Sequence, residues 1–141
     1  MKVVDANVLL YAVNADSPQH DRARDWLDRS LSGDHTVAFP WLVVLAFLRV
    51  STHPSIFSRP LATTEALDIV DAWLAQPGAV VIEPTTRHMH TLRGLVGPVG
   101  MAGNLLNDAH LAALAIEHSA ELVSFDADFT RFPGLKLDRL R

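Results

Sequence analysis

Short apolar runs alternate along this chain with longer segments in which apolar residues recur three and four positions apart. The short runs are bounded by polar residues, a pattern typical of buried β-strands. They lie at residues 1–4, 36–39, 79–82 and 121–125.

The segments between these runs have the spacing of amphipathic or buried helices. Ser17 followed by Pro18 is typical of a helix N-cap with proline in the first turn, and Gly33 would end that helix. Thr63 or Thr64 is the expected cap of a later helix. The helices are expected at residues 7–13, 18–32, 40–50, 64–76, 86–96 and 105–118.

The remaining segments are expected to be loops. Residues 53–62 contain prolines and polar residues, and a series of glycines between Gly94 and Gly103 predicts a flexible connection. A turn at Phe132-Pro133-Gly134 is followed by a short tail with no predicted element. Strands and helices alternate, which favours an α/β fold with a mainly parallel sheet. Without repeats or an interior linker, residues 1–141 are expected to form a single domain.

Composition narrows the possible functions. The absence of cysteine excludes disulfides, thiol catalysis and zinc–thiolate sites. The longest apolar run, residues 37–50, contains a proline and an arginine and falls short of the ~20 residues that a membrane-spanning helix needs. The first strand ends in a charged residue, Asp5, unlike the start of a secretory signal. These features predict a cytoplasmic protein without a membrane segment.

The formal net charge of −4 gives the molecule as a whole no attraction for nucleic acid. Binding to RNA would therefore depend on local clusters of arginine, or on phosphates held through a metal ion.

Three aspartates are candidates for a ligand site. Asp5 follows the first predicted strand and Asp126 follows the last, and parallel sheets bind ligands beyond the carboxyl ends of their strands. Asp108 lies near the start of a helix that is apolar nearly all round, where an unpaired buried charge is costly. Each has a plainer explanation: Asp5 as a helix cap, Asp126 and Asp128 as a turn, and Asp108 as a partner of the helix dipole.

Carboxylates that are held together repel one another and raise each other's pKa unless a cation lies between them. Mg²⁺, or Mn²⁺ in its place, takes oxygen ligands, keeps several waters and bridges to substrate phosphates. Such a site favours in-line hydrolysis of a phosphodiester, because the metal lowers the pKa of a bound water and neutralises charge on the transition state.

Two other motifs give weaker indications. His88-Met89-His90 resembles part of a zinc site, but no cysteine or close acidic residue completes it, so these histidines are expected on a helix surface. Asp5-Ala6-Asn7 resembles the Asp-x-Asp motif of aspartyl-phosphate phosphatases, except that Asn7 replaces the second aspartate, which serves there as acid and base.

Three segments together resemble the PIN-domain family and, within it, the VapC-type toxins of bacterial toxin–antitoxin pairs. They are Val3-Val4-Asp5-Ala6-Asn7-Val8-Leu9-Leu10, Asn107-Asp108-Ala109-His110-Leu111-Ala112-Ala113-Leu114-Ala115 and Ser124-Phe125-Asp126-Ala127-Asp128-Phe129. The resemblance spans nearly the whole chain. It implies a Rossmann-like α/β/α fold, Mg²⁺-dependent endoribonuclease activity on transfer or ribosomal RNA, and a homodimer neutralised by a VapB-type antitoxin.

The resemblance also assigns individual residues. Those that match the catalytic metal site of such proteins are Asp5, Asp108 and Asp126, with Asp128 as a further acid. Asn7 matches a small polar residue that steadies the first aspartate, and Ser124 matches a serine or threonine position near the site.

One position departs from the family pattern. These proteins usually carry a glutamate in the helix after the second strand, and this chain has Ala46 there. The loss of that acid favours chemistry with one metal over chemistry with two. It also leaves an alternative function, a weakly active or inactive PIN module that binds RNA or an antitoxin through its acidic pocket. Arg49 projects from the same helix and is a candidate to contact RNA phosphate.

Overall fold

The computed structural model describes residues 1–97 and 103–141, so part of the predicted glycine-rich connection lies outside the described residues. At its centre is a five-stranded sheet in the order β3-β2-β1-β4-β5, with each neighbouring pair parallel. The strands are β1 (Lys2–Val4), β2 (Val37–Pro40), β3 (Ala79–Ile82), β4 (Glu121–Ser124) and β5 (Lys136–Arg139). The expected α/β fold is confirmed, and the sheet is wholly rather than mainly parallel.

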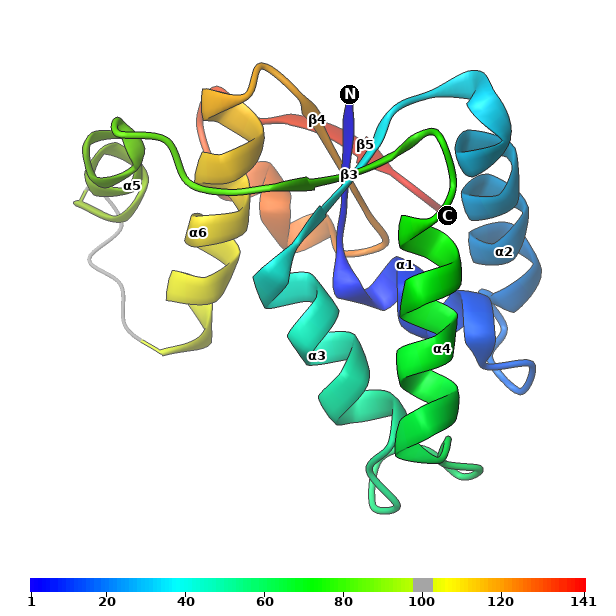
Figure 1. Ribbon diagram of the computed structural model, residues 1–141. Coiled ribbons are helices and arrows are strands. Elements are labelled where there is room, and N and C mark those ends of the chain that lie inside the picture. Colours follow the sequence, from blue (N-terminus) through cyan, green and yellow to red (C-terminus); the bar gives the residue numbers. More distant parts are fainter. Residues whose placement is uncertain (98–102) are drawn as a thin grey trace.

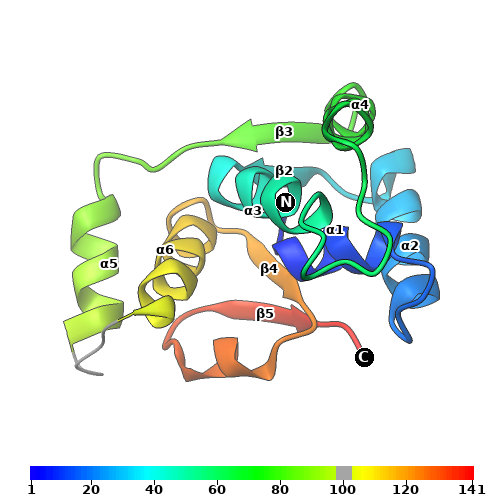
Figure 2. The same ribbon diagram turned by 90° about the horizontal axis from the view of Figure 1, so that it is seen from below.

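Helices cover both faces of this sheet (Figure 1). They are α1 (Ala6–Val13), α2 (His20–Arg29), α3 (Trp41–Ser51), α4 (Thr63–Leu74), α5 (His88–Val96) and α6 (Asn104–Glu117). Figure 2 shows α5 and α6 on one side of the sheet and α1 and α2 on the other. Helix α3 extends from the edge at which β1 and β2 end, and it reaches α4.

The core lies between the sheet and these helices. All residues of β2 are buried, as expected for a central parallel strand that is covered on both faces. The largest fully buried side chains come from the strands, from α1, α2 and α3 and from the carboxyl-terminal third of the chain, and include Phe39, Phe47, Phe129, Leu9, Leu114 and Leu122. Among the described residues, no helix is long and apolar enough to cross a membrane.

The tail after Gly134 was predicted to lack a regular element, and this prediction is wrong. Residues Lys136–Arg139 form β5, which pairs with β4 along its whole length. The strand lies at the edge of the sheet, where charged residues are tolerated and protect the edge from further pairing. Asp138 also accepts a hydrogen bond from Lys2 Nζ (3.4 Å). The alternating charges of this segment concealed it from a search for apolar runs.

Two predicted helix caps lie slightly away from the observed ones. The helix expected from Pro18 begins at His20, because Ser17 forms a turn in which its Oγ accepts a hydrogen bond from Gln19 N (3.2 Å). The cap of α4 is Ala62 rather than either threonine, and its backbone N–H donates to Glu65 Oε1 (3.2 Å).

The order of the strands locates the expected ligand site. The chain moves from β1 outward to β2 and β3, and then crosses to the other side of β1 to form β4 and β5. Ligands of open parallel sheets bind at the point where this direction changes, beyond the carboxyl ends of the strands. Here that point lies between β1 and β4.

Truncation of Phe47 should test how α3 is held. Its side chain is fully buried, and its ring meets that of Trp73 in α4 edge-on, with 4.9 Å between centroids. We expect Phe47→Ala to lower the free energy of unfolding by about 3–5 kcal/mol, measured by urea denaturation. Leu45→Ala on the exposed face of the same helix is the matched control, with a change within about 0.5 kcal/mol. Equal losses in the two variants would show that this packing is misassigned.

Candidate active site

Asp5 and Asp126 reach the same edge of the sheet because β1 and β4 are parallel neighbours. Val4 pairs with Val123, and the backbone N–H of Asp5 donates to Val123 O (3.0 Å). Asp126 lies two residues beyond the end of β4. The chain therefore brings to one place two carboxylates that are separated by most of its length.

A hydrogen-bonded group fixes the carboxylate of Asp5. Ser124 Oγ donates to Asp5 Oδ2 (2.7 Å), and the backbone N–H of Ala6 donates to Asp5 Oδ1 (2.7 Å). Ser124 Oγ also accepts from Asn7 Nδ2 (3.1 Å) and from the backbone N–H of Asp126 (3.0 Å), so the hydroxyl uses its full hydrogen-bonding capacity. Asn7 Oδ1 accepts from Phe125 N (3.3 Å).

Ser124 thus contacts Asp5 directly, whereas Asn7 contacts Ser124 and the backbone of Phe125. Asp5 is also the N-cap of α1, so the plainer explanation of this residue holds alongside the chemical one. Asn7 is tied to the strand that carries Ser124 and is an amide, which cannot serve as the acid and base that a phosphatase of the aspartyl-phosphate kind requires.

Asp108 joins the site from α6. It lines a cavity of about 550 Å³ together with Asp5, at the edge of the sheet where α1 begins. Half of the lining residues of this cavity come from α3. The lining residues are Asp5, Ala6, Leu42, Val43, Leu45, Ala46, Arg49, Asn107, Asp108 and Leu111.

The carboxylates of this site repel one another. Burial raises the pKa of Asp5 from 3.8 to about 6, the hydrogen bonds from Ser124 and Ala6 oppose that rise, and the charges of Asp108 and Asp126 add to it. The pKa of Asp108 is raised as well, first by burial and then by Asp126, while Arg131 opposes the rise. Three acids that are distant in the sequence thus lie within electrostatic reach of one another.

Asp126 and Asp128 also form the turn that was the plainer explanation for them. Asp126 Oδ1 accepts from the backbone N–H of Asp128 (2.8 Å) and caps the short 3₁₀ helix Ala127–Arg131. The Asp128 carboxylate pairs with Arg131 (Nη2 to Oδ2, 3.2 Å), and its side chain is 68% exposed. Asp128 therefore has a counter-charge of its own, unlike the buried Asp5.

The donor set suits a hard cation held by few protein ligands. No three acidic or histidine side chains in the described part of the chain converge into a ready set of metal ligands. Mg²⁺ does not need three protein ligands, because it is commonly held by one or two carboxylates and retains several waters. A buried carboxylate with a raised pKa, beside a second acid at the wall of an open cavity, fits a cation of this kind.

A family model described as PIN domain matches residues 2–135. The chain is 51% identical to ribonuclease VapC37 of Mycobacterium tuberculosis over 99% of this chain and 96% of that protein. It is 41% identical to ribonuclease VapC31 of the same organism, over 96% of each chain. The chain belongs to the PIN-domain family.

Solved structures share the fold of this PIN domain. VapBC2 from Rickettsia felis, solved bound to a DNA fragment from its promoter, matches with a TM-score of 0.73 and 21% identity over 99% of this chain and 98% of that one. VapBC-1 from nontypeable Haemophilus influenzae matches with a TM-score of 0.68 and 12% identity over 98% and 96%.

The PIN domain has Ala46 in its pocket, at the position where the family pattern usually has glutamate. The wall that α3 contributes is therefore apolar apart from Arg49. With this acid missing, the negative charge of the site comes from the strand ends and from α6 alone.

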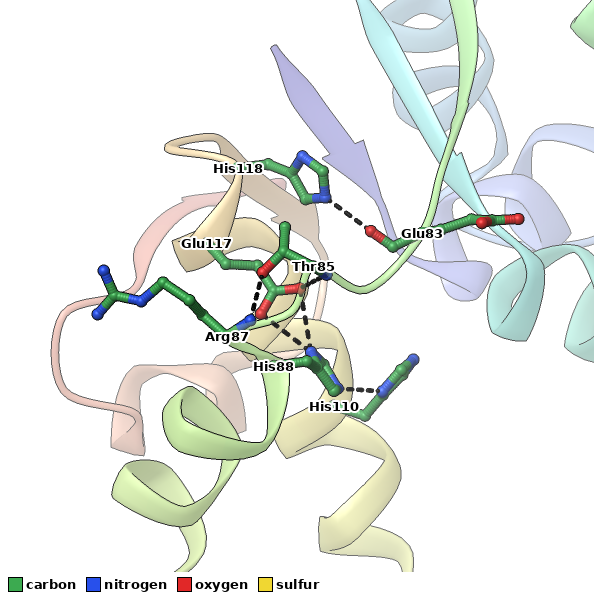
Figure 3. A network of polar contacts seen from close by, with 7 residues as sticks. All are labelled: Glu83, Thr85, Arg87, His88, His110, Glu117 and His118. Carbon is green, nitrogen blue, oxygen red and sulfur yellow. Dashed lines mark hydrogen bonds and ion pairs between the residues drawn. The ribbon is translucent and has the colours of Figure 1, made fainter.

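A second polar group joins α5 to α6, and the sequence did not predict it (Figure 3). His88 Nδ1 lies 3.0 Å from Glu117 Oε2, and His88 Nε2 lies 2.8 Å from His110 Nδ1. Glu117 also accepts from the backbone N–H of Thr85 (2.9 Å). The expectation that His88 lies on a helix surface is wrong, since its side chain is only 12% exposed. The one available signal was the spacing of His110 and Glu117, seven residues apart on one helix face.

Replacement of Asp5 by asparagine should reduce the pH dependence of stability in EDTA. Because the pKa of Asp5 is raised, the folded state keeps a proton between about pH 4 and 6 that the unfolded state has released, so stability falls as pH rises through that window. Above it, the charged form costs up to about 3 kcal/mol. Urea unfolding at pH 4 and pH 7.5 should show this loss in the wild type and a smaller loss in Asp5→Asn, in which the raised pKa of Asp108 remains.

The matched control is Asp71→Asn, which changes the same charge at an exposed position on α4. It should retain the pH dependence of the wild type. If Asp5→Asn also retains it, burial of the Asp5 charge is not the source of the effect.

Proposed function

We infer that this PIN domain is a ribonuclease of the VapC type, the toxin of a toxin–antitoxin pair, and that it hydrolyses RNA phosphodiester bonds with the help of Mg²⁺ or Mn²⁺. The observation that carries this proposal is the buried carboxylate of Asp5, which shares a pocket with Asp108 and is influenced by the charge of Asp126. The relatives named ribonucleases match the chain over almost its full length, which supports the same class of reaction.

In this proposal Asp5 and Asp108 bind the cation, and Asp126 binds it either directly or through a water molecule. When bound, the metal would lower the pKa of a coordinated water and offset negative charge on the phosphate under attack. Ser124 and Ala6 hold the two oxygens of Asp5 in a fixed orientation, so the carboxylate needs no reorganisation when the cation arrives. Asn7 stabilises this arrangement by holding Ser124 in place.

The proposal includes partners. Solved neighbours of the same fold include a toxin–antitoxin complex from Klebsiella pneumoniae, which supports a VapB-type antitoxin as the partner of this chain. The homodimer implied by the family resemblance, and transfer or ribosomal RNA as substrate, belong to the same proposal. A substrate of this kind places the protein in the cytoplasm.

Loss of either carboxylate should greatly slow cleavage. We expect Asp5→Asn and Asp108→Asn each to lower the rate of RNA cleavage in Mg²⁺ by about a hundredfold or more, because the charge that binds the cation is removed. Gel analysis of cleaved transfer and ribosomal RNA, with and without EDTA, measures this effect. Asp71→Asn should cleave as the wild type does. EDTA-insensitive cleavage that is equal in all of these proteins would exclude the metal-dependent mechanism.

Ala46→Glu tests the alternative of a weakly active PIN module. Ala46 faces the same pocket as Asp5 and Asp108, so the new carboxylate should tighten Mg²⁺ binding by roughly tenfold, or about 1.4 kcal/mol. Ala46→Gln, of similar size without the charge, should not do so. Calorimetric titration with Mg²⁺ measures the affinity. If cleavage appears only in Ala46→Glu, the wild-type chain is a binding module; if Mg²⁺ affinity is unchanged, the position of Ala46 relative to the cation is wrong.

A further inference from the structure

Arg49 is the one basic residue among those that line the pocket of Asp5 and Asp108. It lies on α3, eight residues after Trp41 and four after Leu45, so the three side chains share one face of the helix. Trp41 is 50% exposed and Leu45 is 60% exposed. A guanidinium at the end of an exposed apolar stripe thus lines the same pocket as two carboxylates.

A different arginine, Arg131, acts on Asp108, one of the two acids of the pocket. Arg131 pairs with Asp128 (3.2 Å) and partly offsets the rise in the pKa of Asp108, whereas Arg49 is not among the charges that act on the pKa of Asp5 or Asp108. Within the described residues, the Arg49 guanidinium forms no ion pair. Its charge is therefore available to a ligand that enters the pocket.

We propose that Arg49 is a substrate-binding residue that holds a phosphate of single-stranded RNA in the pocket. This inference rests on the proposed function. The protein carries a net charge of −4, so attraction for RNA depends on local cations. A guanidinium binds phosphate through two parallel hydrogen bonds, which gives orientation as well as charge.

The pocket favours an RNA strand over a peptide because of how its charges are distributed. One strand offers a phosphate to Arg49 and another phosphate to a cation at the acidic wall, while the apolar residues between the charges suit a ribose or an unstacked base. A peptide would need an acidic side chain opposite Arg49 and a basic one opposite Asp5 and Asp108.

Loss of this contact should weaken binding more than it slows the chemical step. We expect Arg49→Gln to raise the KM for a short single-stranded RNA by roughly three- to tenfold, with kcat within about twofold of the wild type. The dependence of log kcat/KM on log salt should become shallower by about 0.7, the value for one phosphate of a single strand. Arg49→Lys keeps the charge and should restore the salt dependence but only part of the affinity.

Arg22→Gln is the matched control. Arg22 is an exposed arginine on α2, outside the pocket, and it forms no ion pair within the described residues. Its loss should leave KM and the salt dependence unchanged. Thermal unfolding should give the same Tm for the Arg49 variants, because the residue is exposed.

RNA binding in EDTA, measured by the fluorescence anisotropy of a labelled single-stranded RNA, separates this proposal from the proposed function. If the wild type cleaves RNA but Arg49→Gln behaves as Arg22→Gln does, only the role of Arg49 is wrong. If the wild type does not cleave RNA in Mg²⁺, the proposed function fails, and the anisotropy still reports whether Arg49 binds RNA.

Two further outcomes would overturn the role of Arg49. A fall in kcat with unchanged KM would place Arg49 in the chemical step rather than in binding. A changed sedimentation mass with unchanged RNA affinity would place it in an interface between proteins.

Discussion

The pairing of β1 with β4 is the constraint on which the rest of the site depends. It brings Asp5 and Asp126, which follow these strands, to one edge of the sheet despite their separation in the sequence. Burial and repulsion then raise the pKa of Asp5, so its charged form is held at a cost in stability. Ser124 reduces this cost through its hydrogen bond, and Asn7 keeps Ser124 oriented. A cation bound at this edge would stabilise the charged carboxylates, and this stabilisation would contribute to the affinity for the cation.

Opposite charges are kept apart in the pocket. The carboxylates lie at the ends of the strands and at the start of α6, while Arg49 lies on α3, whose other lining residues are apolar. Arg131, which partly offsets the rise in the pKa of Asp108, is paired with Asp128 at the surface. If Arg49 paired directly with Asp5, the pocket would be neutralised internally and would attract neither a metal ion nor a phosphate.

Local patterns in the sequence predicted the central strands, most helices and the aspartates at the strand ends, because burial leaves apolar runs and strand ends follow from them. The same patterns failed at β5, where an edge strand carries alternating charges and its pairing depends on a distant partner. They failed again at His88, whose partners His110 and Glu117 come from another helix. The proximity of Asp108 to Asp5 depends on how α6 packs against the rest of the protein. The spacing of residues along the chain does not predict this packing.

The position of Asp108 therefore depends on what holds α6. Asp108 and His110 are two residues apart, so they project from nearly opposite faces of this helix, one toward the pocket and the other toward α5. On the far face, Glu117 is only 3% exposed and is bonded both to His88 and to the backbone before α5. A buried polar network whose members are all hydrogen-bonded is rigid, and breaking it leaves a buried charge unpaired. Repulsion from Asp126 acts to push Asp108 away from the sheet edge, and the junction of α5 with α6 opposes that displacement from behind.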